Sequence, residues 1–214
     1  FQFMNQLQQK DLVEKGQLLP VMEHFYTIQG EGYQSGKAAY FVRLGGCTVG
    51  CHWCDVKDSW EASDHPLMDV EEIGKLTLNG KTDLVVITGG EPVSYNLDPL
   101  TKQLKSLNKY LAMETSGAFP LTGQWDWICL SPKKNKPPQE EFYQLAHEMK
   151  VIIFNKDDFK WAEQHRARVN ADCKLYLQVE WSKSDSMMPL VVEYVKNNPE
   201  WTISVQSHKY IDVP

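Results

Sequence analysis

The stretch Cys47-Thr48-Val49-Gly50-Cys51-His52-Trp53-Cys54 places three thiols within eight residues. Three cysteines can bind three irons of a cubane iron–sulfur cluster and leave the fourth iron open to another molecule. The same spacing also suits a zinc site, with His52 or His24 as a fourth ligand, or a thiol redox centre. The stretch by itself leaves these alternatives open, and the rest of the chain has to decide.

The composition of the chain indicates one globular domain. Its 214 residues are 42% hydrophobic and 23% charged, which is enough for a sizeable core. We expect a single domain over residues 1–214, with residues 1–3, which precede Met4, set aside as foreign to the native protein. A net charge of -6 and a pI near 5.5 argue against general nucleic-acid binding, so a small-molecule ligand is expected.

The other cysteines bear on the location of the protein. Cys129 and Cys173 lie far from the first three in strand-like runs, where a small buried hydrophobic residue is the expected role. The cysteine pattern is unlike the disulfide framework of a secreted protein, and neither a leader nor a membrane-spanning apolar run is recognisable. We therefore expect a reduced, cytoplasmic protein that does not bind a membrane.

Short apolar runs alternate with longer amphipathic runs along the chain. This alternation predicts parallel strands joined by crossover helices, either as an open α/β sheet or as a partial barrel. The expected strands are Ala38–Leu44, Asp83–Thr88, Leu111–Thr115, Trp127–Ser131, Lys150–Phe154, Leu175–Val179 and Thr202–Gln206. The expected helices are Val70–Leu78, Leu97–Asn108, Gln139–Ala146, Asp157–Val169 and Pro189–Lys196, the last with its proline in the first turn.

Unusual turns follow four of the expected strands. In chain order they are Gly45-Gly46-Cys47, Gly89-Gly90-Glu91-Pro92, Ser116-Gly117 and Ser131-Pro132-Lys133. Each of them is an ordinary turn when taken alone. The carboxyl ends of parallel strands meet at one edge of a sheet, so together the four turns predict one site.

The three cysteines followed by Gly89-Gly90-Glu91-Pro92 resemble the radical S-adenosylmethionine superfamily, with Trp53 as the aromatic residue before the last cysteine. The resemblance implies an incomplete TIM-like barrel in which Cys47, Cys51 and Cys54 hold a [4Fe–4S] cluster. The cluster's open iron binds S-adenosylmethionine and cleaves it to a 5′-deoxyadenosyl radical, so no side chain is expected to be catalytic. The residues that it assigns to S-adenosylmethionine are Trp53, Gly90, Glu91, Ser116, Ser131, Pro132 and Lys133.

A narrower resemblance covers nearly the whole chain. The stretches Phe25-Tyr26-Thr27-Ile28-Gln29-Gly30-Glu31-Gly32, Phe41-Val42-Arg43-Leu44, Glu114-Thr115-Ser116-Gly117 and Gln206-Ser207-His208-Lys209-Tyr210 resemble the 7-carboxy-7-deazaguanine synthase family. Members convert 6-carboxy-5,6,7,8-tetrahydropterin to 7-carboxy-7-deazaguanine with loss of ammonia, on the route to queuosine. The resemblance implies a cytoplasmic homodimer that takes electrons from a donor such as flavodoxin or ferredoxin.

The resemblance also implies a set of substrate contacts. Arg43 would grip the substrate carboxylate, and Glu31 would contact the amino-pyrimidine part of the pterin. A terminal carboxylate at Pro214 folded into the site would accept hydrogen bonds from the ring, although a frayed tail is the ordinary alternative. The implied substrate residues are Ile28, Gln29, Gly30, Glu31, Arg43, Thr88, His208 and Pro214.

One position departs from the family pattern. Members commonly carry Thr or Ser directly after the Cys-Asp pair, where its hydroxyl binds Mg²⁺, but here Cys54-Asp55 is followed by Val56. Valine has no oxygen to offer a magnesium ion. We therefore expect little or no dependence on Mg²⁺.

Two other functions compete with this interpretation. An activase of glycyl-radical enzymes would share the cysteine motif, but it would not require Gln29-Gly30-Glu31 or Ser131-Pro132-Lys133. A zinc-binding interaction module would use the three cysteines and a histidine.

Overall fold

The computed structural model describes residues 6–214, so the expectation about residues 1–3 lies outside the described residues. They form one nine-stranded sheet with the order β3-β1-β2-β4-β5-β6-β7-β8-β9. From β2 to β9 all neighbouring strands are parallel, whereas β1 is antiparallel to both β2 and β3. The strands are β1 Leu18–Ile28, β2 Ala38–Leu44, β3 Leu67–Asp69, β4 Leu84–Gly89, β5 Tyr110–Thr115, β6 Trp127–Leu130, β7 Glu148–Ile153, β8 Lys174–Val179 and β9 Trp201–Ser204.

Helices α2 to α6 lie in the connections between parallel strands, whereas α1 precedes β1 and α7 follows β9. The helices are α1 Gln6–Glu14, α2 Val70–Leu76, α3 Asp98–Ser106, α4 Glu140–Leu145, α5 Asp157–Arg166, α6 Ser184–Asn197 and α7 His208–Ile211. The expectation of a mostly parallel, incomplete barrel is confirmed, because β3 and β9 remain the two edges of the sheet. Among residues 6–214, no helix has the length and apolar character needed to cross a bilayer.

Side chains alternate between the two faces of the curved sheet. In β5, Leu111 and Met113 are fully buried in the main core, which also contains Leu100 and Leu104 of α3. The opposite face of the same strand carries Glu114, which lines a cavity. The period of two thus divides each strand between an apolar layer under the helices and a more polar interior.

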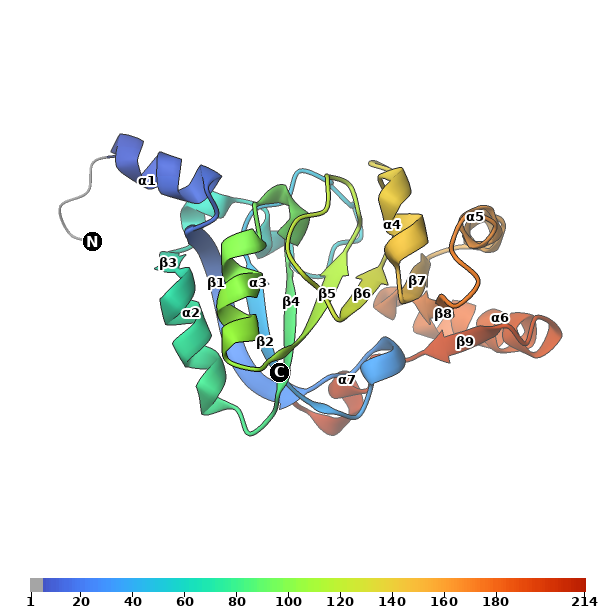
Figure 1. Cartoon of the computed structure of the whole chain (residues 1–214). Coiled ribbons are helices and arrows are strands. Elements are labelled where there is room, and N and C mark those ends of the chain that lie inside the picture. Colours follow the sequence, from blue (N-terminus) through green and yellow to red (C-terminus); the bar gives the residue numbers. More distant parts are fainter. Residues whose placement is uncertain (1–5) are drawn as a thin grey trace.

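The loop between β1 and β2 crosses the open side of the sheet. The Gly32 amide donates to Ser204 Oγ at 3.0 Å, and the Tyr33 amide donates to Glu148 Oε2 at 2.9 Å. The Ser207 amide, just before α7, donates to the Gly30 carbonyl at 2.9 Å. Figure 1 shows this loop from the N-terminal part of the chain beside α7 near the other end. The barrel is therefore closed on this side by a loop and not by a strand.

The structure contains elements that the sequence analysis missed. Strand β1 includes Pro20 and a register shift near Glu23, and its burial does not alternate regularly, so it lacks the period of two on which strand prediction depends. Strand β3 has only three residues, while α1 and α7 carry no buried residues. β3, α1 and α7 are short or unburied elements at the margins of the fold, where apolar patterning is weak.

The predicted start of the last long helix was wrong. Helix α6 begins at Ser184, so Pro189 lies inside the helix and not in its first turn. A proline there removes one N–H···O=C bond and crowds the carbonyl of Asp185. Packing of Met187 and Val191 against the sheet outweighs that cost.

Replacing the exposed Pro189 with alanine should stabilise the protein, because alanine restores the missing helix bond. We expect Pro189→Ala to raise the free energy of unfolding by about 1–3 kcal/mol, measured by denaturant unfolding. Lys196→Ala, at an exposed position of the same helix, is the matched control and should change stability by less than about 0.5 kcal/mol. A destabilising Pro189→Ala would mean that the proline is needed for the bend of the helix.

Candidate active site

A cavity of about 280 Å³ lies at the carboxyl ends of the strands. The structure brings nearly all of the predicted site residues to its wall; Pro132 is buried but does not line it. The predicted residues on the wall are Ile28, Gln29, Gly30, Glu31, Arg43, Cys47, Cys51, Trp53, Cys54, Thr88, Gly90, Glu91, Ser116, Ser131, Lys133, His208 and Pro214.

The cysteine loop is held by backbone hydrogen bonds. The Gly46 amide donates to the Ser59 carbonyl at 2.6 Å, and the Cys47 amide donates to the Trp60 carbonyl at 3.0 Å. Asn135, beyond β6, donates its side-chain amide to the Gly50 carbonyl at 2.6 Å. These contacts fix the loop without using any cysteine side chain, and all three thiols are free and partly buried.

The environment of the thiols fits a cluster better than a single metal ion. Burial raises the pKa of Cys47 and of Cys51, and at Cys51 the positive charge of Lys133 opposes this rise. Within residues 6–214, no three His, Cys, Asp or Glu side chains are close enough to hold one metal ion. Mononuclear zinc needs four ligands on one centre, whereas a cubane binds each cysteine through a different iron. The three thiols on one cavity wall therefore suit a [4Fe–4S] cluster.

The Gly89-Gly90 turn packs directly against the start of the cysteine loop. The Gly90 amide donates to the Leu44 carbonyl at 2.9 Å, and the Glu91 amide donates to the Gly46 carbonyl at 2.9 Å. A Cβ added to Gly90 would lie 2.3 Å from the Gly46 carbonyl oxygen and 2.9 Å from Cys47 Cβ. Sequence analysis assigned this glycine to S-adenosylmethionine; the structure shows that the cysteine loop itself needs the space.

Glu91 ties two of the turns together from a buried position. Its side chain is 2% exposed and accepts from the Ser116 amide at 2.8 Å and the Val93 amide at 3.4 Å. The hydroxyls of Thr115 and Ser116 also donate to it. Both carboxylate oxygens are thus engaged by the protein. We infer that Glu91 positions the turn that carries Gly90, in addition to lining the cavity.

Lys133 lies between the cysteine loop and the turn after β6. Its ammonium donates to Ser131 Oγ at 2.5 Å and sits 5.3 Å from the centre of the Trp53 ring. Burial lowers the pKa of this lysine, while the neighbouring Cys51 opposes the shift. The arrangement joins three predicted S-adenosylmethionine residues on one side of the cavity.

The predicted substrate side of the cavity is built from β1, β2 and β4. Arg43 donates through Nε to Glu23 Oε1 at 2.6 Å, which fixes the guanidinium at the wall. Phe25 and Phe41 also line the wall, and their rings are stacked with centroids 5.5 Å apart. The aromatic pair gives this side a flat apolar surface next to a positive charge.

The end of the chain also reaches the cavity. Thr27 Oγ1 donates to the Pro214 oxygen at 3.1 Å. His208 packs on Gly30 so closely that a Cβ there would lie 2.1 Å from His208 Nδ1. Burial lowers the pKa of His208, and the negative charge of Glu31 opposes that shift.

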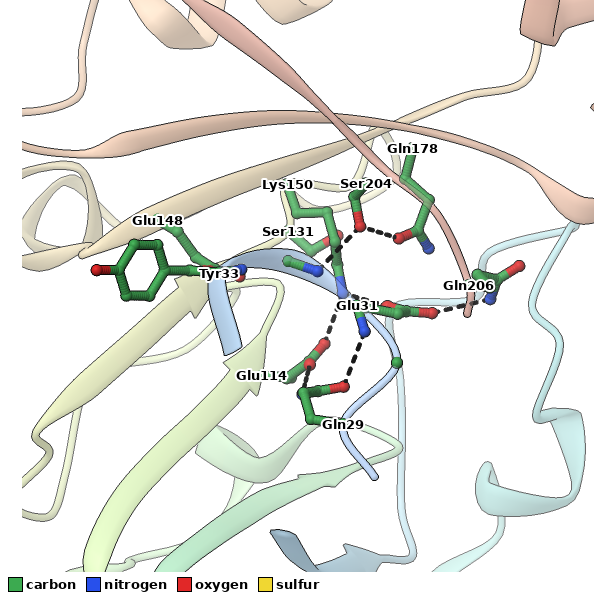
Figure 2. Close-up of polar contacts among 12 residues, drawn as sticks. Gln29, Glu31, Tyr33, Glu114, Ser131, Glu148, Lys150, Gln178, Ser204 and Gln206 are labelled. Carbon is green, nitrogen blue, oxygen red and sulfur yellow. Dashed lines mark hydrogen bonds and ion pairs between the residues drawn. The ribbon is translucent and has the colours of Figure 1, made fainter. Parts of the chain in front are cut away.

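Sequence analysis missed a polar group at the base of the cavity. Figure 2 shows Lys150 of β7 between Glu31 and Glu114, with Gln29 and Gln206 completing the group. Glu114 and Gln206 stand in the motifs quoted above, but neither had been given a role. Lys150 had been taken as the first residue of a strand. The sequence did contain a hint of this group: Glu148 and Lys150 are two residues apart and therefore lie on one face of a strand whose other face is apolar. Two charged residues on the inner face of a buried strand need partners inside the fold.

Comparisons with known proteins agree with this geometry. The family model of the radical SAM superfamily matches residues 41–129. The 7-carboxy-7-deazaguanine synthase of Flavobacterium psychrophilum is 57% identical over 94% of this chain and 96% of its own length. The chain belongs to the 7-carboxy-7-deazaguanine synthase family. The 7-carboxy-7-deazaguanine synthase of a Synechocystis strain is 46% identical to this chain, over 91% of this chain and 93% of the length of that protein.

The fold is that of the same family. The crystal structure of QueE from Escherichia coli superposes with a TM-score of 0.82 at 28% identity, covering 92% of this chain and 98% of that one. Membership of the 7-carboxy-7-deazaguanine synthase family implies a [4Fe–4S] cluster and S-adenosylmethionine. It also implies a small-molecule substrate and an electron donor. The site residues of the chain are compatible with each of these.

Substituting Gly90 tests how closely the two turns must approach. In Gly90→Ala the new Cβ would collide with the Gly46 carbonyl and Cys47, so cluster content after anaerobic reconstitution should fall severalfold. Iron, sulfide and visible absorption measure this content. Gly74→Ala in α2 is the control, since its Cβ meets only flexible side chains of Gln103 and Leu107. Full cluster content in Gly90→Ala would show that the close approach is not required.

Proposed function

We propose that this protein converts 6-carboxy-5,6,7,8-tetrahydropterin to 7-carboxy-7-deazaguanine with release of ammonia, in 7-deazapurine (queuosine) biosynthesis. The observation that carries the proposal is the convergence of the family's separate motifs on one cavity, in a chain 57% identical to a curated synthase over 94% of its length. An activase would leave the Gln29-Gly30-Glu31 segment without a function, although it lines the same cavity.

Cys47, Cys51 and Cys54 would hold the cluster, and Trp53, Gly90, Glu91, Ser116, Ser131, Pro132 and Lys133 would form the S-adenosylmethionine side. When bound, the two groups together supply a deoxyadenosyl radical for hydrogen abstraction. The chain's own residues bind and orient. Glu91 and Lys133 hold the turns on which the nucleotide would rest, while partial burial of the thiols limits access of water.

Arg43 and the aromatic pair would orient the substrate. The ion pair with Glu23 uses Nε, which leaves the two terminal guanidinium nitrogens to take a carboxylate in a two-point contact. Phe25 and Phe41 offer a flat surface for a fused ring, and Thr88 extends the same wall. Because they also line the cavity, we propose that five further residues contact the pterin: Ile28, Gln29, Gly30, Glu31 and His208.

The cellular setting follows from the same chemistry. A cluster held by cysteine thiolates is best preserved in a reducing compartment, so we propose the cytoplasm. Electrons would come from a small redox protein of the flavodoxin or ferredoxin kind. The homodimer remains a prediction.

The function is tested by anaerobic turnover. Reconstituted protein incubated with dithionite, S-adenosylmethionine and carboxytetrahydropterin should give a product with the mass of 7-carboxy-7-deazaguanine. Cys51→Ala, which removes one cluster ligand, should give no product. An active cluster without this product would restrict the assignment to the superfamily.

Dependence on Mg²⁺ is predicted to be weak, because Val56 on the cavity wall offers no oxygen ligand. Chelation by EDTA should change the rate by less than about twofold. Val56→Thr restores a hydroxyl at that position and should create a dependence on added Mg²⁺. Loss of turnover on chelation, with recovery on adding Mg²⁺ to the unaltered protein, would contradict the prediction.

We also propose that Pro214 faces the substrate, since the residue lines the cavity and contacts Thr27. Adding Gly-Ser-Gly after Pro214 would place chain where the substrate lies and should raise its KM about tenfold or more. An equal extension at the other end of the chain is the control. An unchanged KM would return Pro214 to the role of a structural tail.

A further inference from the structure

Four residues at the base of the cavity form a closed ring of hydrogen bonds (Figure 2). Lys150 Nζ donates to Glu114 Oε2 at 2.8 Å and also to Glu31 Oε2. Gln29 Nε2 donates to Glu114 Oε1 at 3.1 Å, and the Glu31 amide closes the ring by donating to Gln29 Oε1 at 3.1 Å. The ring joins the loop after β1 to the central strands β5 and β7.

A branch extends from the ring to the end of the chain. Gln206 Nε2 donates to Glu31 Oε1 at 2.8 Å, and Lys209 Nζ donates to Gln206 Oε1 at 3.0 Å. Ser207 reinforces the branch, because its amide and its hydroxyl both donate to the Gly30 carbonyl. The closing segment, residues 204–214, therefore rests on the loop of residues 29–37, which in turn rests on Lys150.

Lys150 is the only cation of the ring, and its side chain is 3% exposed. A buried ammonium is costly unless it is paired, and two close carboxylates repel each other unless a positive charge lies between them. Burial by itself lowers the pKa of Lys150, but the carboxylates of Glu114 and Glu31 raise it well above its ordinary value. Burial by itself raises the pKa of Glu31, but Lys150 and Gln206 lower it to about 2. Lys150 and Glu31 are thus both charged at neutral pH.

Resting on the function proposed above, we infer that Lys150 is a positioning residue that holds the substrate loop and the closing segment over the cavity by pairing with Glu31 and Glu114. It acts through these residues and not on the reacting atoms. The cluster and S-adenosylmethionine side of the cavity is held separately, by Glu91, Ser131 and Lys133. Loss of Lys150 should therefore weaken pterin binding selectively.

The first test uses the stable analogue 6-carboxypterin and reconstituted holoprotein. In Lys150→Met, the dissociation constant for the analogue should rise about tenfold or more, while iron content and affinity for S-adenosylmethionine stay unchanged. Backbone hydrogen exchange should quicken in residues 29–37 and 204–214. The control Lys174→Met alters an exposed lysine on the next strand, β8, and should match the unaltered protein. Unchanged exchange, or an equal loss of affinity for both ligands, would overturn the inference.

A second variant separates the branch from the ring and keeps all three charged side chains of the ring. Gln206→Ala removes the part of the branch that runs through the Gln206 side chain but leaves the ring intact. Hydrogen exchange should then quicken in residues 204–214 and remain slow in residues 29–37. If both segments loosen together, Lys150 does not hold the loop independently. This variant keeps the inference testable even if Lys150→Met fails to fold.

The pH profile distinguishes a charge-based role from simple packing. Without Lys150, a proton shared between Glu31 and Glu114 can take its place at low pH, and its loss at higher pH leaves two repelling charges. Other titratable groups facing the ring are Cys129, Lys133, Glu148 and His208. The analogue titrates in the same way in both proteins, so dividing the dissociation constant of Lys150→Met by that of the unaltered protein at each pH removes the analogue's own contribution. That ratio should rise about tenfold between pH 6 and pH 9; a constant ratio would overturn the inference.

The outcome is separable from that of the proposed function. Analogue binding and exchange that respond as described would support the role of Lys150 even if no deazaguanine product formed. Product formation at an unaltered KM in Lys150→Met would leave the function standing and remove Lys150 from it.

Discussion

The close approach of two backbones, at the ends of the parallel strands β2 and β4, is the contact on which the rest of the site depends. Leu44 pairs in register with Gly89, and a Cβ on Gly89 would lie 2.3 Å from the Leu44 carbonyl oxygen. The strand ends can be this close only because glycine has no side chain. The cysteine loop then lies directly on the Gly90 turn, and Glu91 joins that turn to the end of β5. One steric constraint thus aligns three successive strand ends.

The interior of the partial barrel is organised by charge as much as by apolar packing. Along β7, Met149 and Val151 enter the apolar core while Glu148 and Lys150 face inward. Glu148 accepts from the Trp127 indole N–H at 3.1 Å as well as from the Tyr33 amide. The polar interior is therefore paired layer by layer, and each layer holds part of the loop that closes the barrel. Substrate binding and barrel closure depend on the same residues.

The sequence predicted the parts of the fold that repeat and the parts of the site that lie in motifs. Strand β2 was predicted with its observed bounds, and the other parallel strands within two residues, because each combines an apolar face with a clear turn. The three cysteines and Gly90 were singled out because such spacings are rare, and they line one cavity. Lys150 was missed because a lysine at a predicted strand end is ordinarily solvated, and only the folded chain shows Glu31 and Glu114 beside it. Pro189 was misplaced because local preference at that position yields to packing.

The loop that closes the barrel has a consequence for how this architecture could change. A strand ladder fixes the distance between its neighbours at the spacing of backbone hydrogen bonds. Here the last seam is made instead by the side chains of Ser204 and Glu148, which reach the amides of Gly32 and Tyr33. The girth of the barrel on this side is set by side-chain length. Substitutions at Ser204 and Glu148 could therefore widen or narrow the cavity while every strand keeps its register. The same scaffold could then accept a ring system of a different size without a change in its sheet.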